Sequence, residues 1–348
     1  MSTTETPRPD ETRTPGLTRR SMMKGAAWSL PVLAATAAAP SHAASVPVTP
    51  PCPTFDACGL YGSSGSVVFR YSGSPATTGG GFTVNENSGP FAGSYWSSNL
   101  AFGPYVSPDC TGVSYVFYGS RYNNSFLNIY RAKAGAAGQN PTVEVVGPIP
   151  SGPSWAAWGG MACDPFGDLW MISNLTALST TQIARVTPQT ASTLSSTFVM
   201  SAVGLVAGGP NAAVAASGTI VPDITFTGDG RMYGLIYSTA AGSSGQVWLC
   251  EYLTDTLTAG GKMTISPIRQ VTGPAATVST SNYGFAWLGS ATTADSGAFY
   301  AVNGGTGELY RIDPATGVSV SAGTKTSPAT YDYAATDLAS APVGGCSI

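Results

Sequence analysis

The chain has 348 residues, 15 Lys and Arg against 18 Asp and Glu, a net charge of −3 and 43% hydrophobic residues. This composition excludes a disordered chain, which needs low hydrophobicity and high net charge, and it disfavours nucleic acid as a partner, which needs a basic patch. Few charges beside 43 Gly and many aromatic residues are typical of an all-β extracellular protein.

The first 43 residues carry the parts of an export signal. A polar stretch precedes the apolar run from Gly25 to Ala39, and Ser41-His42-Ala43 supplies small residues for cleavage. Residues 18–24, TRRSMMK, resemble the twin-arginine signature of bacterial export. A Sec signal or a membrane anchor is the alternative, but about 15 apolar residues interrupted by Pro31 are too few for the ~20 of a spanning helix. We therefore predict a twin-arginine signal peptide over residues 1–43, an extracellular or cell-wall-associated protein, and no membrane span in the mature chain.

Removal of that signal changes both charge and chemistry. The remaining chain keeps 10 Lys and Arg against 15 Asp and Glu, a net charge of −5, and it loses His42, the only histidine. Without histidine the mature chain lacks a Ser-His-Asp or Cys-His relay, a His-ligated metal site and a histidine general base. We predict an N-terminal extension over residues 44–57 and a single domain over residues 58–348.

A repeat of about 60 residues, built from strands, covers that domain. Each repeat begins with a polar residue or Gly, an aliphatic or aromatic residue, and Ala or Thr. An Asp- and Gly-rich turn, a second apolar strand, an aromatic-aliphatic third strand and a fourth segment follow, as expected for a four-stranded propeller blade. The first segments are 99–101, 160–162, 223–225, 284–286 and 337–339, the third are 67–71, 128–132, 182–186, 247–251 and 309–313, and the fourth include 142–146, 197–202, 267–271 and 317–321.

The two ends of the domain each hold part of one repeat. Asp337-Leu338-Ala339 has no second half after it, while the strands from Gly59 have no first segment before them. The sequence therefore predicts an all-β propeller, most simply of five four-stranded blades, closed by the C-terminal strand pairing into the N-terminal blade. Six blades is the alternative if one repeat has diverged.

Six cysteines in an exported chain predict disulfides, although the spacing alone leaves fifteen pairings open. Ring closure favours a bridge from Cys346 to Cys52 or Cys58. Cys110 and Cys163, in adjacent repeats, are a plausible second pair. Cys250 occupies an apolar position, where a buried thiol and a bridge are equally expected.

Three segments together resemble the propeller-like regions of exported bacterial surface proteins, particularly actinobacterial ones. They are residues 309–317 (LYRIDPATG), residues 283–287 (YGFAW) and the start at 58–61 (CGLY). The resemblance spans nearly the whole mature chain and implies a propeller with a role in adhesion or surface architecture. In that family such regions often precede stalk-like or wall-anchored domains.

Inner-strand residues at one stage of every repeat should converge on the central channel. Asn99, Gly160, Asp223, Gly284 and Asp337 occupy that stage. Asp223 and Asp337 are the candidate catalytic carboxylates, and with Asn99 they are candidate ligands for Ca²⁺. The alternative is structural, with the acids accepting backbone N–H groups and fixing the blade spacing.

Aromatic residues near the inner strands are the other candidates. Trp96, Trp155 and Trp158, with Asn99, are predicted to contact a ligand, with packing between blades as the alternative. The acids that recur in the turns are predicted to form the turns themselves rather than to bind metal. They are Asp109, Asp164, Asp168, Asp229 and Asp295.

Two functions remain. The first is a secreted, monomeric, non-enzymatic propeller that needs no cofactor and binds a cell-surface polymer, carbohydrate or protein. The second is a secreted hydrolase or lyase acting on a carbohydrate or a lactone through Asp223 and Asp337, with or without Ca²⁺. A propeller can host either, so the fold alone does not separate them.

Overall fold

The computed structural model describes most of the chain from Pro51 onward, and residues Thr49–Ile348 form one compact unit. The described residues are 51–64, 67–72, 77–83, 99–106, 110–123, 126–135, 141–150, 158–173, 178–187, 197–216, 218–257, 261–277, 283–289, 294–304, 306–324, 337–343 and 346.

Nearly all regular structure in this part of the chain is β. The strands are β1 (Leu60–Ser64), β2 (Val67–Ser72), β3 (Thr77–Thr83), β4 (Leu100–Val106), β5 (Val113–Asn123), β6 (Phe126–Lys133), β7 (Thr142–Pro150), β8 (Trp158–Cys163), β9 (Leu169–Ser173), β10 (Gln182–Thr187), β11 (Thr197–Ala207), β12 (Thr219–Phe226), β13 (Met232–Tyr237), β14 (Val247–Leu253), β15 (Gly261–Val271), β16 (Tyr283–Gly289), β17 (Gly297–Asn303), β18 (Glu308–Ile312), β19 (Ser319–Thr324) and β20 (Asp337–Ser340). The helical segments are α2 (Ala212–Ala216) and the 3₁₀ turns η1 (Leu178–Thr180), η2 (Thr254–Thr256), η3 (Pro274–Thr277) and η4 (Ala294–Ser296).

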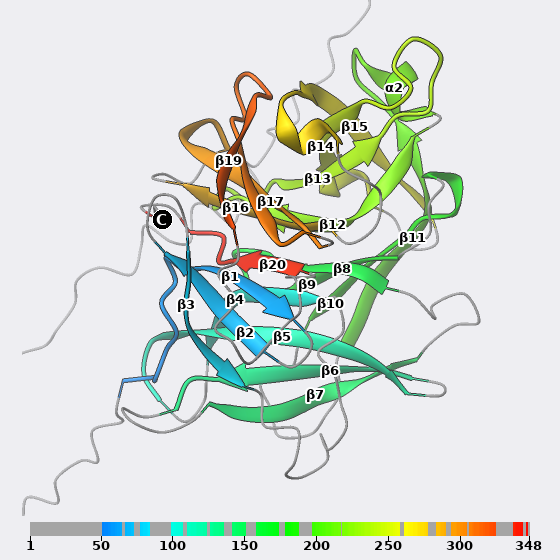
Figure 1. The fold of residues 1–348 in the computed structure, drawn as a ribbon. Coiled ribbons are helices and arrows are strands. Elements are labelled where there is room, and N and C mark those ends of the chain that lie inside the picture. Colours follow the sequence, from blue (N-terminus) through cyan, green and yellow to red (C-terminus); the bar gives the residue numbers. More distant parts are fainter. Residues whose placement is uncertain are drawn as a thin grey trace, which may run out of the picture. The chain divides into compact units, whose positions relative to one another are not determined.

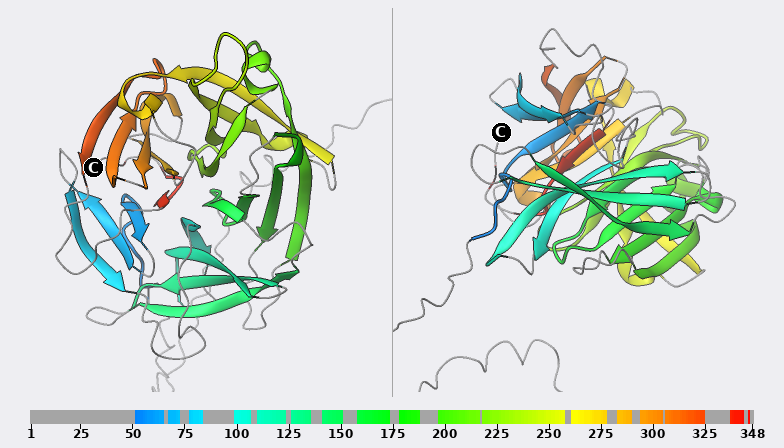
Figure 2. Two further views of the ribbon diagram at one scale, coloured as in Figure 1. Left: turned by 45° about the vertical axis from the view of Figure 1, so that its right-hand side comes forward. Right: turned by 90° about the horizontal axis from the view of Figure 1, so that it is seen from below.

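Five four-stranded antiparallel blades form a ring, which confirms the predicted five-bladed propeller (Figure 1 and Figure 2). From the inside outward, blade 1 is β20-β1-β2-β3, blade 2 is β4-β5-β6-β7, blade 3 is β8-β9-β10-β11, blade 4 is β12-β13-β14-β15 and blade 5 is β16-β17-β18-β19. Each inner strand contacts the inner strands of both neighbouring blades, so the ring is continuous.

The C-terminal strand closes the ring, as the incomplete repeats predict. β20 pairs antiparallel with β1, so that Asp337 lies opposite Ser63 and Ser340 lies opposite Leu60. Blade 1 is therefore built from both ends of the domain. The pairing leaves β1 without a free edge, and an unpaired edge would otherwise be open to aggregation.

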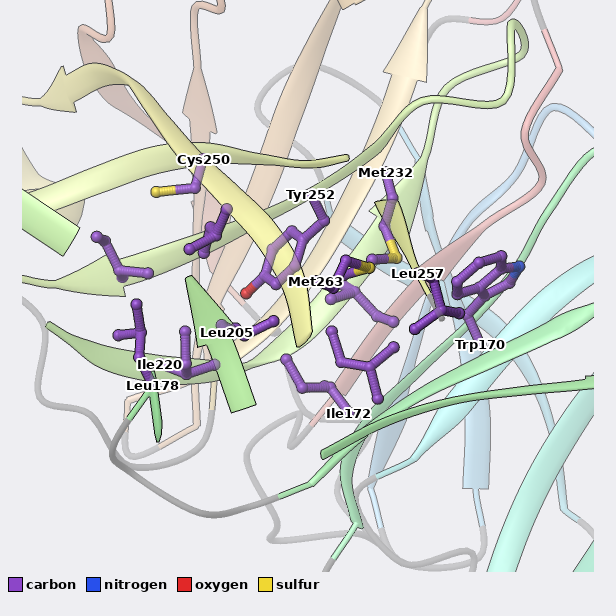
Figure 3. Close-up of a cluster of buried hydrophobic side chains, with 14 of the residues drawn as sticks. Trp170, Ile172, Leu178, Leu205, Ile220, Met232, Cys250, Tyr252, Leu257 and Met263 are labelled. Carbon is purple, nitrogen blue, oxygen red and sulfur yellow. The ribbon is translucent and has the colours of Figure 1, made fainter. Parts of the chain in front are cut away.

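The apolar core is divided among the five interfaces between blades. Among the described residues, five clusters of buried hydrophobic side chains occur, and each joins side chains from two neighbouring blades. Figure 3 shows the cluster between blades 3 and 4, where Trp170 and Ile172 pack with Met232 and Tyr252. Each blade therefore depends on both neighbours for burial.

Strand β9 shows how one strand serves two interfaces. All of its residues are buried. Leu169 and Met171 belong to the cluster shared with blade 2, whereas Trp170 and Ile172 belong to the cluster shared with blade 4. Successive side chains of a strand point to opposite faces, so a strand covered on both faces is a continuous apolar run.

The outer strands also contact one another, which the repeat pattern does not predict. The second half of β11 pairs in parallel with the first half of β15, with Leu205 opposite Met263. The next joint continues in the same direction, because Thr272 just after β15 forms a bridge with Val318 just before β19. Blades 3, 4 and 5 are thus linked at the rim as well as at the centre.

Two disulfides are present, Cys52–Cys110 and Cys58–Cys346. The predicted bridge from Cys346 to the start of the domain is confirmed, and its partner is Cys58. The predicted pair Cys110–Cys163 is wrong. Cys163 is the last residue of inner strand β8 and is buried between blades 2 and 3, whereas Cys110 lies between β4 and β5. Cys250 is a buried thiol.

No helix within the described residues is long and apolar enough to cross a membrane.

Ring closure should depend on Leu338 more than on any exposed apolar residue. Leu338 of β20 is 1% exposed and packs in the cluster between blades 5 and 1. Leu338→Ala should lower the free energy of unfolding by about 2–5 kcal/mol, the usual cost of such a cavity. Val320→Ala is the control, because Val320 is 51% exposed on β19, and a change within about 0.5 kcal/mol is expected there. Urea unfolding measures both, and equal losses would contradict a closing role for β20.

Candidate functional site

The two candidate carboxylates enter the centre of the ring from different local structures. Asp223 lies in β12 next to Pro222, which has no N–H to donate to the ladder, and the register between β12 and β13 shifts between Ile220 and Ile224. Asp337 is the first residue of β20. A bulge and a strand end thus place the two acids.

Both carboxyl groups accept hydrogen bonds from backbone amides. The N–H of Ile224 donates to Oδ1 of Asp223 at 2.8 Å, and the N–H of Phe285, in β16 of the next blade, donates to Oδ2. Asp337 repeats this pattern, accepting from Leu338 at 2.8 Å and from Leu100 in β4 of the next blade. Each acid therefore ties the inner strand of its own blade to that of the following blade.

A glycine brings the two acids together. Strand β16 lies between β12 and β20, and a Cβ on Gly284 would be 2.3 Å from the amide nitrogen of Leu338. A larger residue would force β16 and β20 apart. With Gly284 in place, the carboxyls of Asp223 and Asp337 hydrogen-bond to each other across the inner end of blade 5.

Burial sets the protonation of this acid pair. Burial raises the pKa of Asp337 to about 8. Burial and the charge of Asp337 raise the pKa of Asp223 well above its ordinary value. A carboxyl donates a hydrogen bond only when it is protonated, so the bond between the two acids holds a proton at pH values where exposed acids are ionised.

The acid pair shares a proton, as a catalytic acid–base dyad does, but its carboxyl groups are not exposed to a substrate. Asp223 and Asp337 are each 1% exposed, and all four carboxyl oxygens accept backbone amides. A substrate would have to displace these bonds to reach a carboxyl. What the arrangement does directly is fix the spacing of blades 4, 5, 1 and 2.

The third central candidate is also buried. Asn99 immediately precedes β4, and its Nδ2 donates to Oγ of Ser120 in β5 at 2.9 Å. Within the described ranges, no group of three or more His, Cys, Asp or Glu side chains is placed to hold a metal ion. The Ca²⁺ site of Asn99, Asp223 and Asp337 stays a prediction.

The side chains of the three candidate tryptophans lie outside the part of the chain that the structure describes. Trp96 and Trp155 lie outside the described residues. Trp158 is the first residue of β8, but its side chain is outside the described part. Their predicted contact with a ligand therefore stays a prediction.

The turn between β8 and β9 shows why its acids recur. Oδ1 of Asp164 accepts hydrogen bonds from the N–H groups of Phe166 and Asp168 at 2.9 and 3.0 Å. Its Oδ2 accepts a hydrogen bond from Nε1–H of Trp170 at 3.1 Å. Asp168 forms an ion pair with Arg185 of β10. In the turn after β12, Asp229 accepts a hydrogen bond from Thr227.

The structure does not test the turn-forming role predicted for the other two turn acids. Asp109 is outside the described residues, and Asp295 lies in η4 with its side chain outside them.

Phe166, at the tip of the β8–β9 turn, is a surface candidate that the repeat pattern does not single out. Its side chain is 86% exposed, and Val106 and Val113 of the neighbouring hairpin are 62% and 50% exposed. A Cβ on Gly167 would lie 3.1 Å from the carbonyl oxygen of Pro104, so this turn lies against the end of β4. An aromatic residue at the centre of an Asp-rich turn was the available signal.

The fold and the centre of the ring together define the class of this protein: a five-bladed β-propeller whose inner strands are joined by a buried acid pair. No family model matches the chain, and no curated protein matches it either.

Among solved structures, a protein from Lactobacillus plantarum is 14% identical with a TM-score of 0.31, covering 78% of this chain and 68% of its own. An α-L-arabinofuranosidase from Fusarium graminearum in complex with an iminosugar inhibitor is 10% identical with a TM-score of 0.37, covering 76% of this chain and 80% of its own. The GH93 α-L-arabinofuranosidase of the same organism in complex with arabinobiose is 11% identical with a TM-score of 0.38, covering 86% and 85%.

The acid pair should make stability depend on pH. The folded pKa of Asp337, about 8, lies above the ordinary value of 3.8. The folded state therefore binds more protons than the unfolded state between about pH 4 and pH 8, and stability falls as the pH rises through that range. We expect Tm to fall by at least about 2 °C between pH 5 and pH 8.5, or about 1 kcal/mol for a domain of this size.

The substitution Asp337→Asn tests the source of that pH dependence. An amide donates to Asp223 without titrating, but it has one acceptor oxygen fewer, so stability should fall by about 1–3 kcal/mol and the slope with pH should flatten. Asp255→Asn, at an exposed acid in η2, is the control and should keep the wild-type slope. Thermal unfolding from pH 5 to 8.5 distinguishes them, and an unchanged slope in Asp337→Asn would assign the pH dependence elsewhere.

Proposed function

We propose that this protein is an exported, non-catalytic β-propeller that binds a saccharide polymer of the cell surface or its surroundings. The signal-like segment and the two disulfides support an extracellular destination, since disulfides persist in oxidising compartments. The observation that carries the binding function is the exposed Phe166 on a hydrogen-bonded turn.

The state of the acid pair supports a non-catalytic role. A glycosidase needs one carboxyl to protonate the leaving group and a second to act as nucleophile or to activate water, so both must reach the substrate. Here the carboxyls of Asp223 and Asp337 are buried and bonded to backbone amides of two blades. Their removal from those bonds would loosen the ring.

The turn that carries Phe166 is suited to present this side chain from a fixed backbone. Oδ1 of Asp164 accepts hydrogen bonds from the N–H groups of Phe166 and Asp168, and the N–H of Gly167 donates to the carbonyl oxygen of Asp164 at 3.1 Å. A turn held this way loses little backbone freedom when a ligand stacks on Phe166. The apolar face of the Phe166 ring is available to the C–H face of a sugar.

The size of the apolar surface favours a saccharide over a protein. A stable protein interface buries about 800 Å² on each partner. Phe166 with Val106 and Val113 gives three exposed apolar side chains in this part of the described surface. One aromatic ring with a small apolar border matches a sugar unit better than a protein face.

A glycan and polysaccharide array on the purified chain, followed by calorimetry on each ligand found, tests this function. Phe166→Ala should weaken binding about tenfold, or 1.4 kcal/mol, while Val320→Ala on blade 5 should bind as the wild type does. Binding that is unchanged in Phe166→Ala would move the site away from this turn. An array with no binding to the wild type would overturn the saccharide proposal.

A hydrolysis screen on the same ligands tests the non-catalytic part. We expect no release of reducing sugars by the wild type. Turnover that disappears in Asp223→Asn, with the fold retained by circular dichroism, would instead establish the acid pair as catalytic.

A further inference from the structure

The six cysteines differ in whether they have a partner. Four of them form the two disulfides: Cys58–Cys346 joins the two ends of the domain at blade 1, and Cys52–Cys110 joins the segment before β1 to blade 2. The other two, Cys163 and Cys250, are buried between blades. We propose that the ring closes before any disulfide forms, and that the closed ring selects which thiols are oxidised. This inference goes beyond the proposed function and does not depend on it.

Non-covalent contacts alone bring Cys52 to Cys110. The N-terminal strap, residues 51–57, lies along β5 of blade 2. Oγ of Ser114 donates to the carbonyl oxygen of Pro53 at 2.7 Å, and the N–H of Tyr115 donates to Oγ1 of Thr54 at 2.8 Å. The ring of Phe55 packs edge-on against the ring of Phe117, and the two ring centroids are 4.8 Å apart. These bonds hold Pro53 and Thr54, which directly follow Cys52, against β5.

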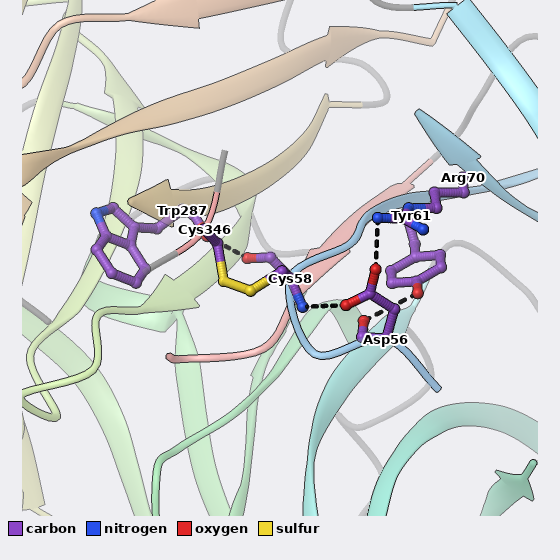
Figure 4. Close-up of a disulfide and its surroundings, with 7 residues drawn as sticks. Asp56, Cys58, Tyr61, Arg70, Trp287 and Cys346 are labelled. Atoms are coloured by element: carbon purple, nitrogen blue, oxygen red, sulfur yellow. Dashed lines mark hydrogen bonds and ion pairs between the residues drawn. A yellow bond between two sulfur atoms is a disulfide. The ribbon is translucent and has the colours of Figure 1, made fainter. Parts of the chain in front are cut away.

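The second pair is positioned in the same way from both sides (Figure 4). The N–H of Cys58 donates to Oδ1 of Asp56 at 2.9 Å, and Asp56 pairs with Arg70 of β2 at 2.5 Å. On the other side, the N–H of Cys346 donates to the carbonyl oxygen of Gly289 in blade 5 at 2.6 Å. The strand β20 leads directly to this tail, so ring closure delivers Cys346 to Cys58.

Ring closure also buries the two remaining thiols, those of Cys163 and Cys250. Cys163 and Cys250 are 3% and 0% exposed. Cys163 packs so closely on β4 that a Cβ on Gly103 would lie 2.3 Å from its Sγ. Burial also raises the pKa of both thiols, which lowers the fraction of thiolate, the species that attacks a disulfide.

The oxidation itself is thiol–disulfide exchange with a small disulfide such as oxidised glutathione. One cysteine thiolate attacks a sulfur of the oxidant, forming a mixed disulfide and releasing one thiolate of the oxidant. The second cysteine thiolate then attacks the protein sulfur of that mixed disulfide and releases the other. Each protein pair loses two electrons and two protons, and each oxidant molecule becomes two thiols.

The fully reduced full-length chain provides the test. Prepared under a dithiol reductant, it should show native-like near-ultraviolet circular dichroism and a cooperative urea transition. Brief alkylation with iodoacetamide should label the partly exposed Cys52, Cys58 and Cys110, while the buried Cys163 and Cys250 should react only after urea is added. A reduced chain without tertiary signal would overturn the proposal.

Reoxidation then tests the selection of pairs. With oxidised glutathione under native conditions, peptide mapping should find only Cys52–Cys110 and Cys58–Cys346. The same oxidation in concentrated urea is the control and should give mixed pairs that include Cys163 or Cys250. Mixed pairs under native conditions would show that the ring does not direct oxidation.

A double substitution that removes one disulfide distinguishes closure of the ring from its covalent stabilisation. Cys58→Ser with Cys346→Ser should keep the tertiary signal and still form Cys52–Cys110, with a lower urea midpoint than the oxidised wild type. Loss of the tertiary signal in this variant would mean that the disulfide makes the closure rather than fixing it.

Discussion

The burial of apolar side chains between neighbouring blades is the interaction on which the rest of the structure depends. Every blade contributes to two of the five clusters, and strands such as β9 place alternate side chains in each. A blade alone would expose two apolar faces, so no blade is expected to be stable by itself. Blade 1 is complete only when β20 of the C-terminal end pairs with β1.

The acid pair at the centre follows from the same geometry. Inner strands of adjacent blades are too close for full side chains, as Gly284 against Leu338 shows, yet they do not pair by a backbone ladder. Their amides still need acceptors, because an unpaired buried N–H is costly. Asp223 and Asp337 each supply such an acceptor to the inner strand of the following blade, and sharing a proton lets the two acids be buried together. The role of these residues in holding the ring accounts for their position without any substrate.

The repeat pattern allowed much of this fold to be predicted, and its errors are local. Residues 337–339 were recognised as an inner strand because the first segments align, and the Cys58–Cys346 bridge followed from that closure. The predicted Cys110–Cys163 pair was wrong because the two cysteines lie at different stages of their repeats: Cys163 ends inner strand β8, whereas Cys110 lies between β4 and β5 and pairs with Cys52. The exposure of Phe166 and the rim pairing of β11 with β15 depend on how blades twist and pack, which a repeat period does not contain.

The seam also explains why the cysteines lie where they do. At blade 1 the interface is completed by four residues of β20 and a strap of seven residues, so the chain ends there can separate with the loss of few contacts. A covalent link lowers the entropy gained when those ends separate, and the gain is larger for a longer loop. The 288-residue separation of Cys58 and Cys346 spans the whole ring. Packing and hydrogen bonds that close blade 1 first would bring Cys346 to Cys58, and oxidation would then make the closure hard to reverse.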